Sequence, residues 1–301
     1  MGLGHPHHHP HDGHDHDRGE ITRRLVWVLA ITATFTVAEI VGGILSNSLA
    51  LLADAGHMFS DVAALGLSVF AIRLARRPPT QRRTYGYARF EILAALVNGA
   101  TLLVVAGLIV VEAWERVREP VSIDGVVMLS VAGLGLMVNL VAAFVLHGHA
   151  HDNLNVRGAY LHVLGDLLGS VGTIAAGVIV LATGWTLADP IISVLIAMLI
   201  LFSAWNLVRE ATDVLLESVP GHLVLAEIVR ELESIEGLGE VHDVHVWTLT
   251  SGFVALSAHG VIDDPAEHTR ILGEVRDRMA RFGIEHVTFQ IELRPLYQLA
   301  K

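Results

Sequence analysis

Two pairs of histidine and aspartate lie inside apolar stretches of the sequence, and both pairs have the same spacing. His57 and Asp61 occur in LLADAGHMFSD, and His162 and Asp166 occur in GAYLHVLGDLLGS. Residues four apart on a helix share one face, with Cβ atoms about 5–6 Å apart, so each pair can grip one ion. Imidazole nitrogens and carboxylate oxygens suit zinc, which takes four ligands in a tetrahedral site. We therefore predict that the two pairs together form one divalent-metal site.

The free-energy cost of placing these four side chains inside a membrane favours a functional role for them. An ionisable side chain at the centre of a membrane-spanning helix costs about 2.5–3.5 kcal/mol on insertion scales unless it is paired or hydrated. The alternative is that the histidines and aspartates only pair across helices as packing contacts. For Asp54, three residues before His57, a structural hydrogen bond and a supporting role beside the site both remain open.

The pairs lie in two of six apolar segments, at about 25–45, 49–74, 90–114, 123–146, 158–182 and 187–208. A helix needs about 20 apolar residues to cross a bilayer. The composition agrees, because 52% of the 301 residues are hydrophobic and only 17% are charged, against about a quarter charged in soluble domains. We predict an α-helical polytopic membrane protein whose six transmembrane helices occupy residues 21–210.

Arginine marks alternate loops between these segments. Short cytoplasmic loops collect Arg and Lys, which predicts a multi-pass protein of the plasma membrane, the inner membrane of the cell, with both termini in the cytoplasm. The arginines that support this orientation are Arg18, Arg23, Arg24, Arg76, Arg77, Arg82, Arg83, Arg157 and Arg209.

The pattern becomes that of a soluble domain from residue 211 onward. Residues 222–236 form an amphipathic helical pattern, and 241–249 and 253–262 alternate as strands around a Thr-Ser-Gly turn. A second helix is predicted over 265–282, beginning at Pro265, and a last strand over 286–293. Residues 211–301 are therefore expected to form a cytoplasmic α-β-β-α-β domain of the α+β class.

Several partners are excluded and one driving force is required. The net charge of −11 argues against nucleic acid, whose binding needs clustered cations, and the chain has no G-x-x-x-x-G-K-[ST] nucleotide motif. Moving a doubly charged ion outward against 100 mV costs about 4.6 kcal/mol. Protons compete with metal for His and Asp ligands. These points predict a metal/proton antiporter that works by alternating access.

Two other classes of protein could use the same ligands. A membrane-embedded metalloenzyme would activate water at the metal, but catalytic zinc keeps an open position that four protein ligands would fill. A zinc-sensing membrane protein would need no charged pairs within the bilayer. We therefore expect a transporter and not an enzyme.

Two histidine-rich stretches lie outside the apolar segments. Residues 1–20 have too few apolar groups to fold, so we predict a disordered cytoplasmic tail. Such tracts bind metal weakly and in many geometries. Pro, Gly and Asp interrupt the tail, which favours a natural metal-collecting segment over a purification tag. The loop before the fifth segment either feeds metal to the site or is only a solvated linker. The histidines are His5, His7, His8, His9, His11, His14 and His16 in the tail, and His147, His149 and His151 in the loop.

The sequence resembles the cation diffusion facilitator family of zinc transporters from about residue 23 to 293. The resemblance rests on SNSLALLADAGHMFSD, RRTYGYARFEILAALVNG, NVRGAYLHVLGDLLGS and VHDVHVWTLTSG. It implies a homodimer that exports zinc from the cytoplasm in exchange for protons, with membrane lipid around it. It also implies that the C-terminal domain is metallochaperone-like, with a ferredoxin-like fold.

The resemblance also points to a second metal site in that domain. His242, His259 and Glu292 match positions at which metal-binding members place ligands of a cytoplasmic site. Zinc is thus expected both as transported substrate and as regulatory ligand. The loop between the second and third segments departs from the family pattern, because it offers Tyr85, Tyr87 and arginines where other members use His or Asp. We predict no metal in that loop.

Overall fold

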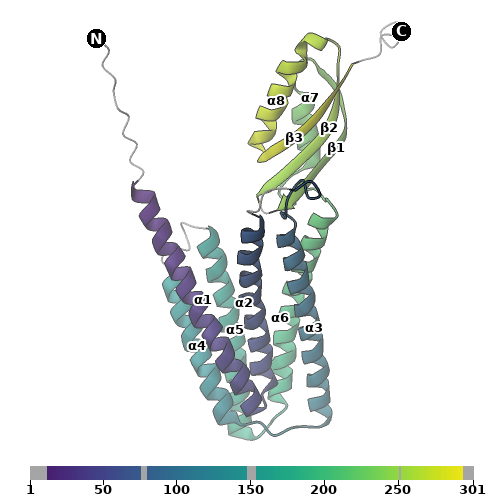
Figure 1. Ribbon diagram of the computed structural model, residues 1–301. Coiled ribbons are helices and arrows are strands. Elements are labelled where there is room, and N and C mark those ends of the chain that lie inside the picture. The colour runs from purple at the N-terminus through teal and green to yellow at the C-terminus, as the bar shows by residue number, and fades with distance from the viewer. Residues whose placement is uncertain (1–11, 76–79, 148–153, 251, 294–301) are drawn as a thin grey trace, which may run out of the picture. The chain divides into compact units, whose positions relative to one another are not determined.

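The structure is a computed structural model that describes residues 12–75, 80–147, 154–250 and 252–293 (Figure 1). The described chain divides into two bodies. The first contains the residues up to Leu65 together with Ala100–Ala204, and the second contains Gly66–Gly99 and the residues from Trp205 onward. The long helices of the described chain are α1 (Asp12–Ser46), α2 (Leu49–Ala75), α3 (Phe90–Arg118), α4 (Gly125–His147), α5 (Leu154–Thr183) and α6 (Ala188–Leu215).

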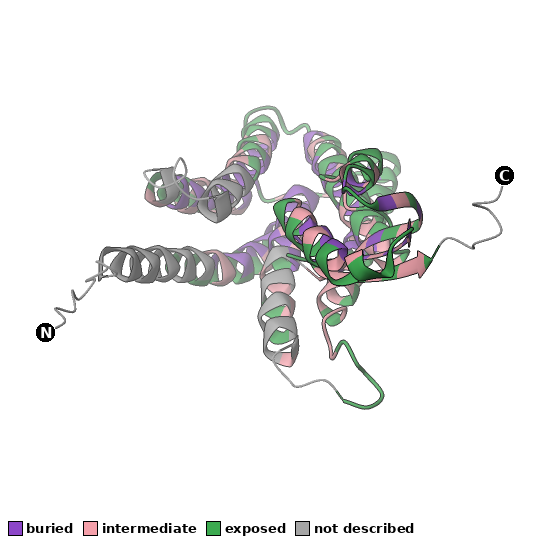
Figure 2. Cartoon of the chain, turned by 90° about the horizontal axis from the view of Figure 1, so that it is seen from above, coloured by how far each residue is buried: buried purple, intermediate pink, exposed green. Residues whose placement is uncertain are grey.

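Four of these helices have the length and composition of membrane spans within the described residues. Within the described residues, α3, α4, α6 and the Val163–Thr183 part of α5 are long and apolar enough to cross a bilayer, and α1 adds a shorter apolar stretch, Ala30–Ser46. Large apolar side chains such as Phe144 and Phe202 are 85% and 72% exposed, and Figure 2 shows exposed residues in green along the helices. Lipid is the solvent for such faces. The predicted helical membrane domain is confirmed.

Alanine lines the helix faces that meet inside the first body. Ala53, Ala106, Ala132, Ala176 and Ala197 come from five different helices and are nearly inaccessible. Small side chains let helix backbones approach closely, which is how helices associate where lipid removes the hydrophobic driving force. Within this body α4 packs against both α1 and α5.

A buried aspartate on α6 fixes the start of α2. Asp189 is fully buried and accepts hydrogen bonds from the backbone N–H groups of Leu49, at 2.8 Å, and Ala50, at 3.2 Å. It also accepts one from the Ser48 hydroxyl at 2.6 Å. The first N–H groups of a helix have no intrahelical partner. Asp189 supplies those partners and anchors the helix that carries His57.

The N-terminal tail differs from the expectation in one respect. We predicted disorder to residue 20, whereas α1 begins at Asp12. Extending an existing helix needs no new nucleation, so a polar segment can continue the helix of the apolar segment after it. His5, His7, His8, His9, His11, His149 and His151 lie outside the described residues. Only the helical backbone is described for His14, His16 and His147.

The C-terminal part of the second body is a small α+β domain. Its elements are α7 (Leu225–Glu233), β1 (Leu238–Thr250), β2 (Phe253–Ile262), a 3-10 turn (Pro265–Glu267), α8 (His268–Arg281) and β3 (Ile284–Leu293). The sheet order is β1-β2-β3, with β1 antiparallel and β3 parallel to β2. Figure 1 shows α7 and α8 on one face of this sheet. The predicted α-β-β-α-β order is confirmed.

The core of this domain follows from helical periodicity. Ile271, Val275 and Met279 recur every four residues on α8, and all three are buried with Ile228 and Leu232 of α7. Spacing of this kind places one apolar stripe against the sheet.

An ion-pair network joins α8 to α7. Arg278 lies 2.6 Å from Glu274 on its own helix and 3.0 Å from Glu231 on α7. Hydrogen bonding to Glu274 raises the pKa of the Arg278 guanidinium. These ion pairs therefore link the two helices of the domain to each other.

Candidate metal centres

The structure brings together one member of each His-x-x-x-Asp pair. His57 on α2 and Asp166 on α5 approach to 3.8 Å between Nε2 and Oδ1. Asp166 is buried, with 4% of its side chain exposed, and His57 is 23% exposed. An imidazole nitrogen and a carboxylate oxygen at this separation can bind one divalent cation. The geometry therefore supplies two ligand groups from two helices.

The other two predicted ligands are placed only by their helices. Asp61 lies on α2 one turn after His57, and His162 lies on α5 one turn before Asp166. Their side chains lie outside the described ones. Side chains at i and i+4 share a helix face, so the backbone places both residues on the faces that carry His57 and Asp166.

A glycine lets α5 approach α2 closely beside this pair. A Cβ atom at Gly169 would lie 3.0 Å from Oδ1 of Asp54, a separation tighter than most real contacts. On the same helix, Ser170 accepts a hydrogen bond of 3.3 Å from the Asn139 amide on α4. Asn139 thus joins α4 to α5 by an interhelical hydrogen bond. Asp54 is buried, and it faces Gly169 on the helix that carries Asp166.

Glu39 on α1 is a further buried ionisable residue of the first body and was missed by the sequence analysis. It is 1% exposed, and its Oε2 is buried without a hydrogen-bond partner among the described residues. Glu39 is the one charged residue between 25 and 45. The rule applied to the two pairs, that charge inside a span is costly and marks function, could have found it.

A second group of ligand-type side chains lies on the sheet of the C-terminal domain. One ligand atom each of His242, His259 and Glu292 lies within 4.8 Å of the others. Oε1 of Glu292 is 3.1 Å from Nδ1 of His259, and Oε2 is 3.6 Å from Nε2 of His242. Nδ1 of His242 is buried without a hydrogen-bond partner among the described residues. The residues that the resemblance assigned to a cytoplasmic site therefore lie together.

An irregularity in β1 shapes this cluster. His242 pairs directly with His259 across the two strands, and the register then shifts before His245. Asp243 lies at the shift with φ of 52°, in the left-handed region. A bulge of this kind redirects side chains at functional sites. The Asp243 carboxylate reaches His245 at 2.9 Å and His259 at 3.8 Å, and so extends the cluster.

Comparison with known proteins assigns the family. Residues 25–216 match the cation efflux transmembrane domain, and residues 220–294 match the cytoplasmic domain of cation efflux proteins. The chain therefore belongs to the cation efflux family, and it is a metal-cation transporter rather than an enzyme.

Several relatives are similar over nearly their whole length. The zinc transporter ZitB of Escherichia coli (strain K12) is 44% identical, with 97% of this chain and 94% of the relative covered. The metal cation efflux system protein CzcD of Cupriavidus metallidurans is 44% identical, with 99% and 92% covered. A cadmium, cobalt and zinc/H(+)-K(+) antiporter of Bacillus subtilis is 41% identical, with 93% and 92% covered. The solved metal-bound C-terminal domain of CzcD is 38% identical, covers 24% of this chain and 100% of that one, and has a TM-score of 0.22.

Proposed function

We propose that the protein exports zinc, and related divalent transition metals, through a site formed by His57, Asp61, His162 and Asp166. The observation that carries the proposal is the approach of His57 to Asp166 across α2 and α5. Relatives named as zinc transporters, at 44% identity over nearly the full length, support zinc as the substrate.

Proton exchange supplies the driving force in this proposal. Metal binds to neutral imidazole and ionised carboxylate, so a proton and a metal ion exclude each other at the same atoms. A site that opens alternately to each side then releases metal where protons are abundant and loads it where they are scarce. The Bacillus subtilis relative that is named an antiporter supports this reading.

The cytoplasmic cluster has a separate role in the proposal. His242, His259 and Glu292 bind zinc from the cytoplasm and adjust transport to its concentration. We further propose that the protein is a homodimer of the plasma membrane with both termini in the cytoplasm. The match to the cytoplasmic domain of cation efflux proteins and the loop arginines support these assignments.

The experiment is zinc flux into proteoliposomes that contain a zinc dye and a pH dye. The unaltered protein is expected to move zinc in one direction and protons in the other. Asp166→Ala removes a buried ligand oxygen and is expected to abolish both fluxes, and Asp61→Ala should do the same. Asp213→Ala is a matched control, because Asp213 is an exposed aspartate of α6. Its Oδ2 lies 3.9 Å from Nε of the exposed Arg209.

The outcomes separate the proposals. Full zinc flux in Asp166→Ala vesicles would overturn the transport site. Zinc flux without opposing proton movement would overturn proton exchange while leaving the metal site intact. Glu292→Ala should shift the zinc dependence without stopping transport.

A further inference from the structure

The loop between α2 and α3 has a folded conformation over residues 80–89. Thr80 and Arg83 exchange backbone hydrogen bonds of 3.0 Å in both directions, and the Thr80 hydroxyl accepts a third from the Arg83 N–H at 3.1 Å. Gly86 donates its N–H to the Arg83 carbonyl at 2.9 Å and has φ of 65°, which favours glycine. The backbone on which Arg82 and Arg83 stand is therefore fixed by local hydrogen bonds.

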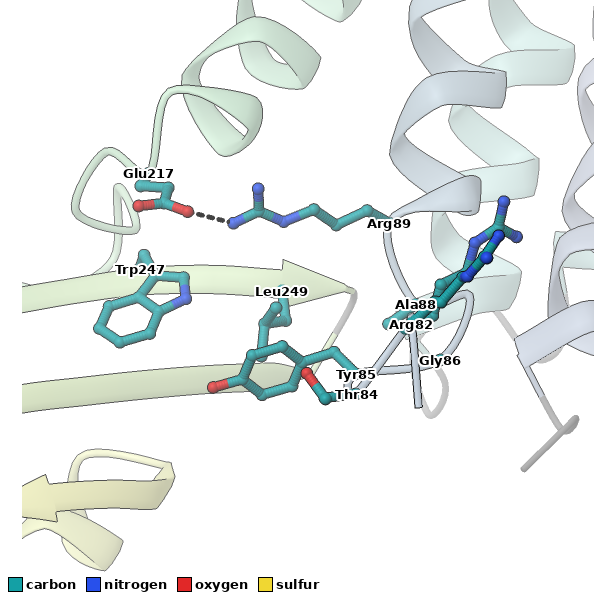
Figure 3. Close-up of a pocket in the computed structure, with 10 residues that line it drawn as sticks. Arg82, Thr84, Tyr85, Gly86, Ala88, Arg89, Glu217, Trp247 and Leu249 are labelled. Atoms are coloured by element: carbon teal, nitrogen blue, oxygen red, sulfur yellow. Dashed lines mark hydrogen bonds and ion pairs between the residues drawn. The ribbon is translucent and has the colours of Figure 1, made fainter. Parts of the chain in front are cut away.

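This loop forms one wall of a cavity of about 370 Å³ within the second body (Figure 3). The other walls are Glu217, just after α6, and Trp247 and Leu249 of β1. Arg89 crosses the cavity and its Nη2 lies 2.6 Å from Oε1 of Glu217. These segments are far apart in the sequence, and the cavity exists only because they meet.

A second polar contact joins the same strand to the start of α3. The Thr250 hydroxyl at the end of β1 donates to Glu91 at 2.5 Å. Glu91 lies in the first turn of α3. Both contacts hold the cavity walls in place without using Arg82 or Arg83.

The cavity has more positive than negative charge. Arg82, Arg83 and Arg89 line it, and Glu217 is the one acidic residue among the lining residues of the described chain. Arg89 already pairs with Glu217. Arg82 and Arg83 are exposed and form no ion pair with a described acidic residue, although the Arg83 guanidinium lies 4.4 Å from the centre of the Tyr87 ring. The guanidinium groups of Arg82 and Arg83 therefore have no acidic partner among the described residues and can bind an anion.

Two features indicate which anion the cavity would bind: its arginines, and its place beside a membrane-spanning helix. The planar fork of arginine matches the paired oxygens of a phosphate. Phe90, the first residue of α3, follows this loop directly, so the loop lies where a membrane span begins. Basic clusters beside a membrane span bind anionic lipid headgroups. Tyr85 and Trp247 add amphipathic rings of the kind found at the lipid–water boundary.

We propose that this cavity binds the phosphate of an anionic phospholipid headgroup, through Arg82 and Arg83. Loop arginines alone would satisfy the preference for positive charge on the cytoplasmic side. That preference does not account for a hydrogen-bonded loop that places two consecutive arginines in the lining of a cavity with aromatic walls. Bound lipid would link the loop, the end of α6 and β1.

The test is thermal unfolding of the full-length protein in a neutral detergent with added phosphatidylglycerol. The lipid is expected to raise the Tm of the unaltered protein, and phosphatidylcholine at the same concentration is not. The double variant R82Q/R83Q should need about tenfold more phosphatidylglycerol for the same shift, since two charge-assisted hydrogen bonds are lost. The double variant R209Q/R276Q removes the same charge from exposed arginines outside the cavity and should behave as the unaltered protein.

Three results would count against the proposal. An equal loss of response in R209Q/R276Q would show that only net charge matters. An unchanged response in R82Q/R83Q would show that the cavity is not the site. If inorganic phosphate raised the Tm as much as the lipid at equal concentration, the phosphate site would stand and its assignment to lipid would fall. Circular dichroism of R82Q/R83Q without lipid checks that the variant is folded, and R82K/R83K should recover part of the response because it restores charge without the planar fork.

Discussion

Glu39 offers a test at the scale of single residues, because its carboxyl is buried and its Oε2 has no hydrogen-bond partner among the described residues. A buried polar group without a partner costs about 1–3 kcal/mol. Glu39→Leu fills a similar volume without that polar group, so we expect an equal or higher Tm in detergent. Glu39→Gln keeps a polar group at this place and should not raise the Tm. A lower Tm for Glu39→Leu than for Glu39→Gln would show that the polar group contributes to stability.

The sequence predicted some residues of the candidate centres and missed others for a physical reason. The His-x-x-x-Asp spacing places two ligand-type groups on one helix face whatever the rest of the fold does, so both helices could be named from the sequence. The approach of His57 to Asp166 depends on how α2 and α5 pack. Glu39 has no local partner of this kind, and only the packed structure shows that its carboxyl is buried.

At the scale of elements, the approach of α5 to α2 depends on one missing side chain. Gly169→Ala would put a Cβ atom 3.0 Å from Oδ1 of Asp54, whereas a Cβ atom at Gly165 would meet nothing within 4 Å. Crowding a packed interior costs about 1–3 kcal/mol. We expect Gly169→Ala to lower the Tm and slow zinc flux.

Gly165→Ala is the matched control, one turn earlier on the same helix. Alanine favours a helix over glycine by about 0.5–1 kcal/mol, so this variant should keep its flux and have an equal or higher Tm. If both variants had the Tm and flux of the unaltered protein, close approach at Gly169 would not matter.

The elements themselves were largely predictable, and their ends were not. In lipid, a run of about 20 apolar residues can pair its backbone N–H and C=O groups internally only as a helix. All six predicted segments are helical. The predicted strand 241–249 is part of the longer β1, Leu238–Thr250, and the predicted helix 222–236 shortens to α7, Leu225–Glu233. Such ends depend on tertiary contacts and on turns such as the one at Gly237, with φ of 84°.

At the scale of the whole molecule, contacts between distant segments were beyond the sequence analysis. The loop at 80–89 was interpreted only as a basic cytoplasmic loop that binds no metal. Its cavity also needs Glu217 and Trp247, more than a hundred residues later in the chain. No local pattern in either segment indicates that they meet, because the fold of the second body as a whole brings them together.

The two candidate metal centres, one in each body, should be separable by mutation: a variant that loses one centre should keep the other. The cluster in the C-terminal domain offers three ligand-type side chains, His242, His259 and Glu292, which is one fewer than a closed structural zinc site uses. We propose that the open fourth position lets this site exchange zinc in response to its concentration. His259→Ala removes the residue that contacts both Glu292 and Asp243. It is expected to raise the zinc concentration for half-maximal flux by about fivefold, the lower range of allosteric coupling, with the maximal rate kept.

Calorimetric titration of the full-length His259→Ala protein should show one class of zinc site fewer than the unaltered protein. His222→Ala is the control, because His222 is an exposed histidine of the same body that is not one of the three clustered ligands, and it should leave flux and titration unchanged. A loss of maximal rate in His259→Ala with its titration intact would mean that the cluster supports the fold of the transporter and does not sense metal. An unchanged half-maximal concentration together with the lost site would mean that zinc binds there without adjusting transport.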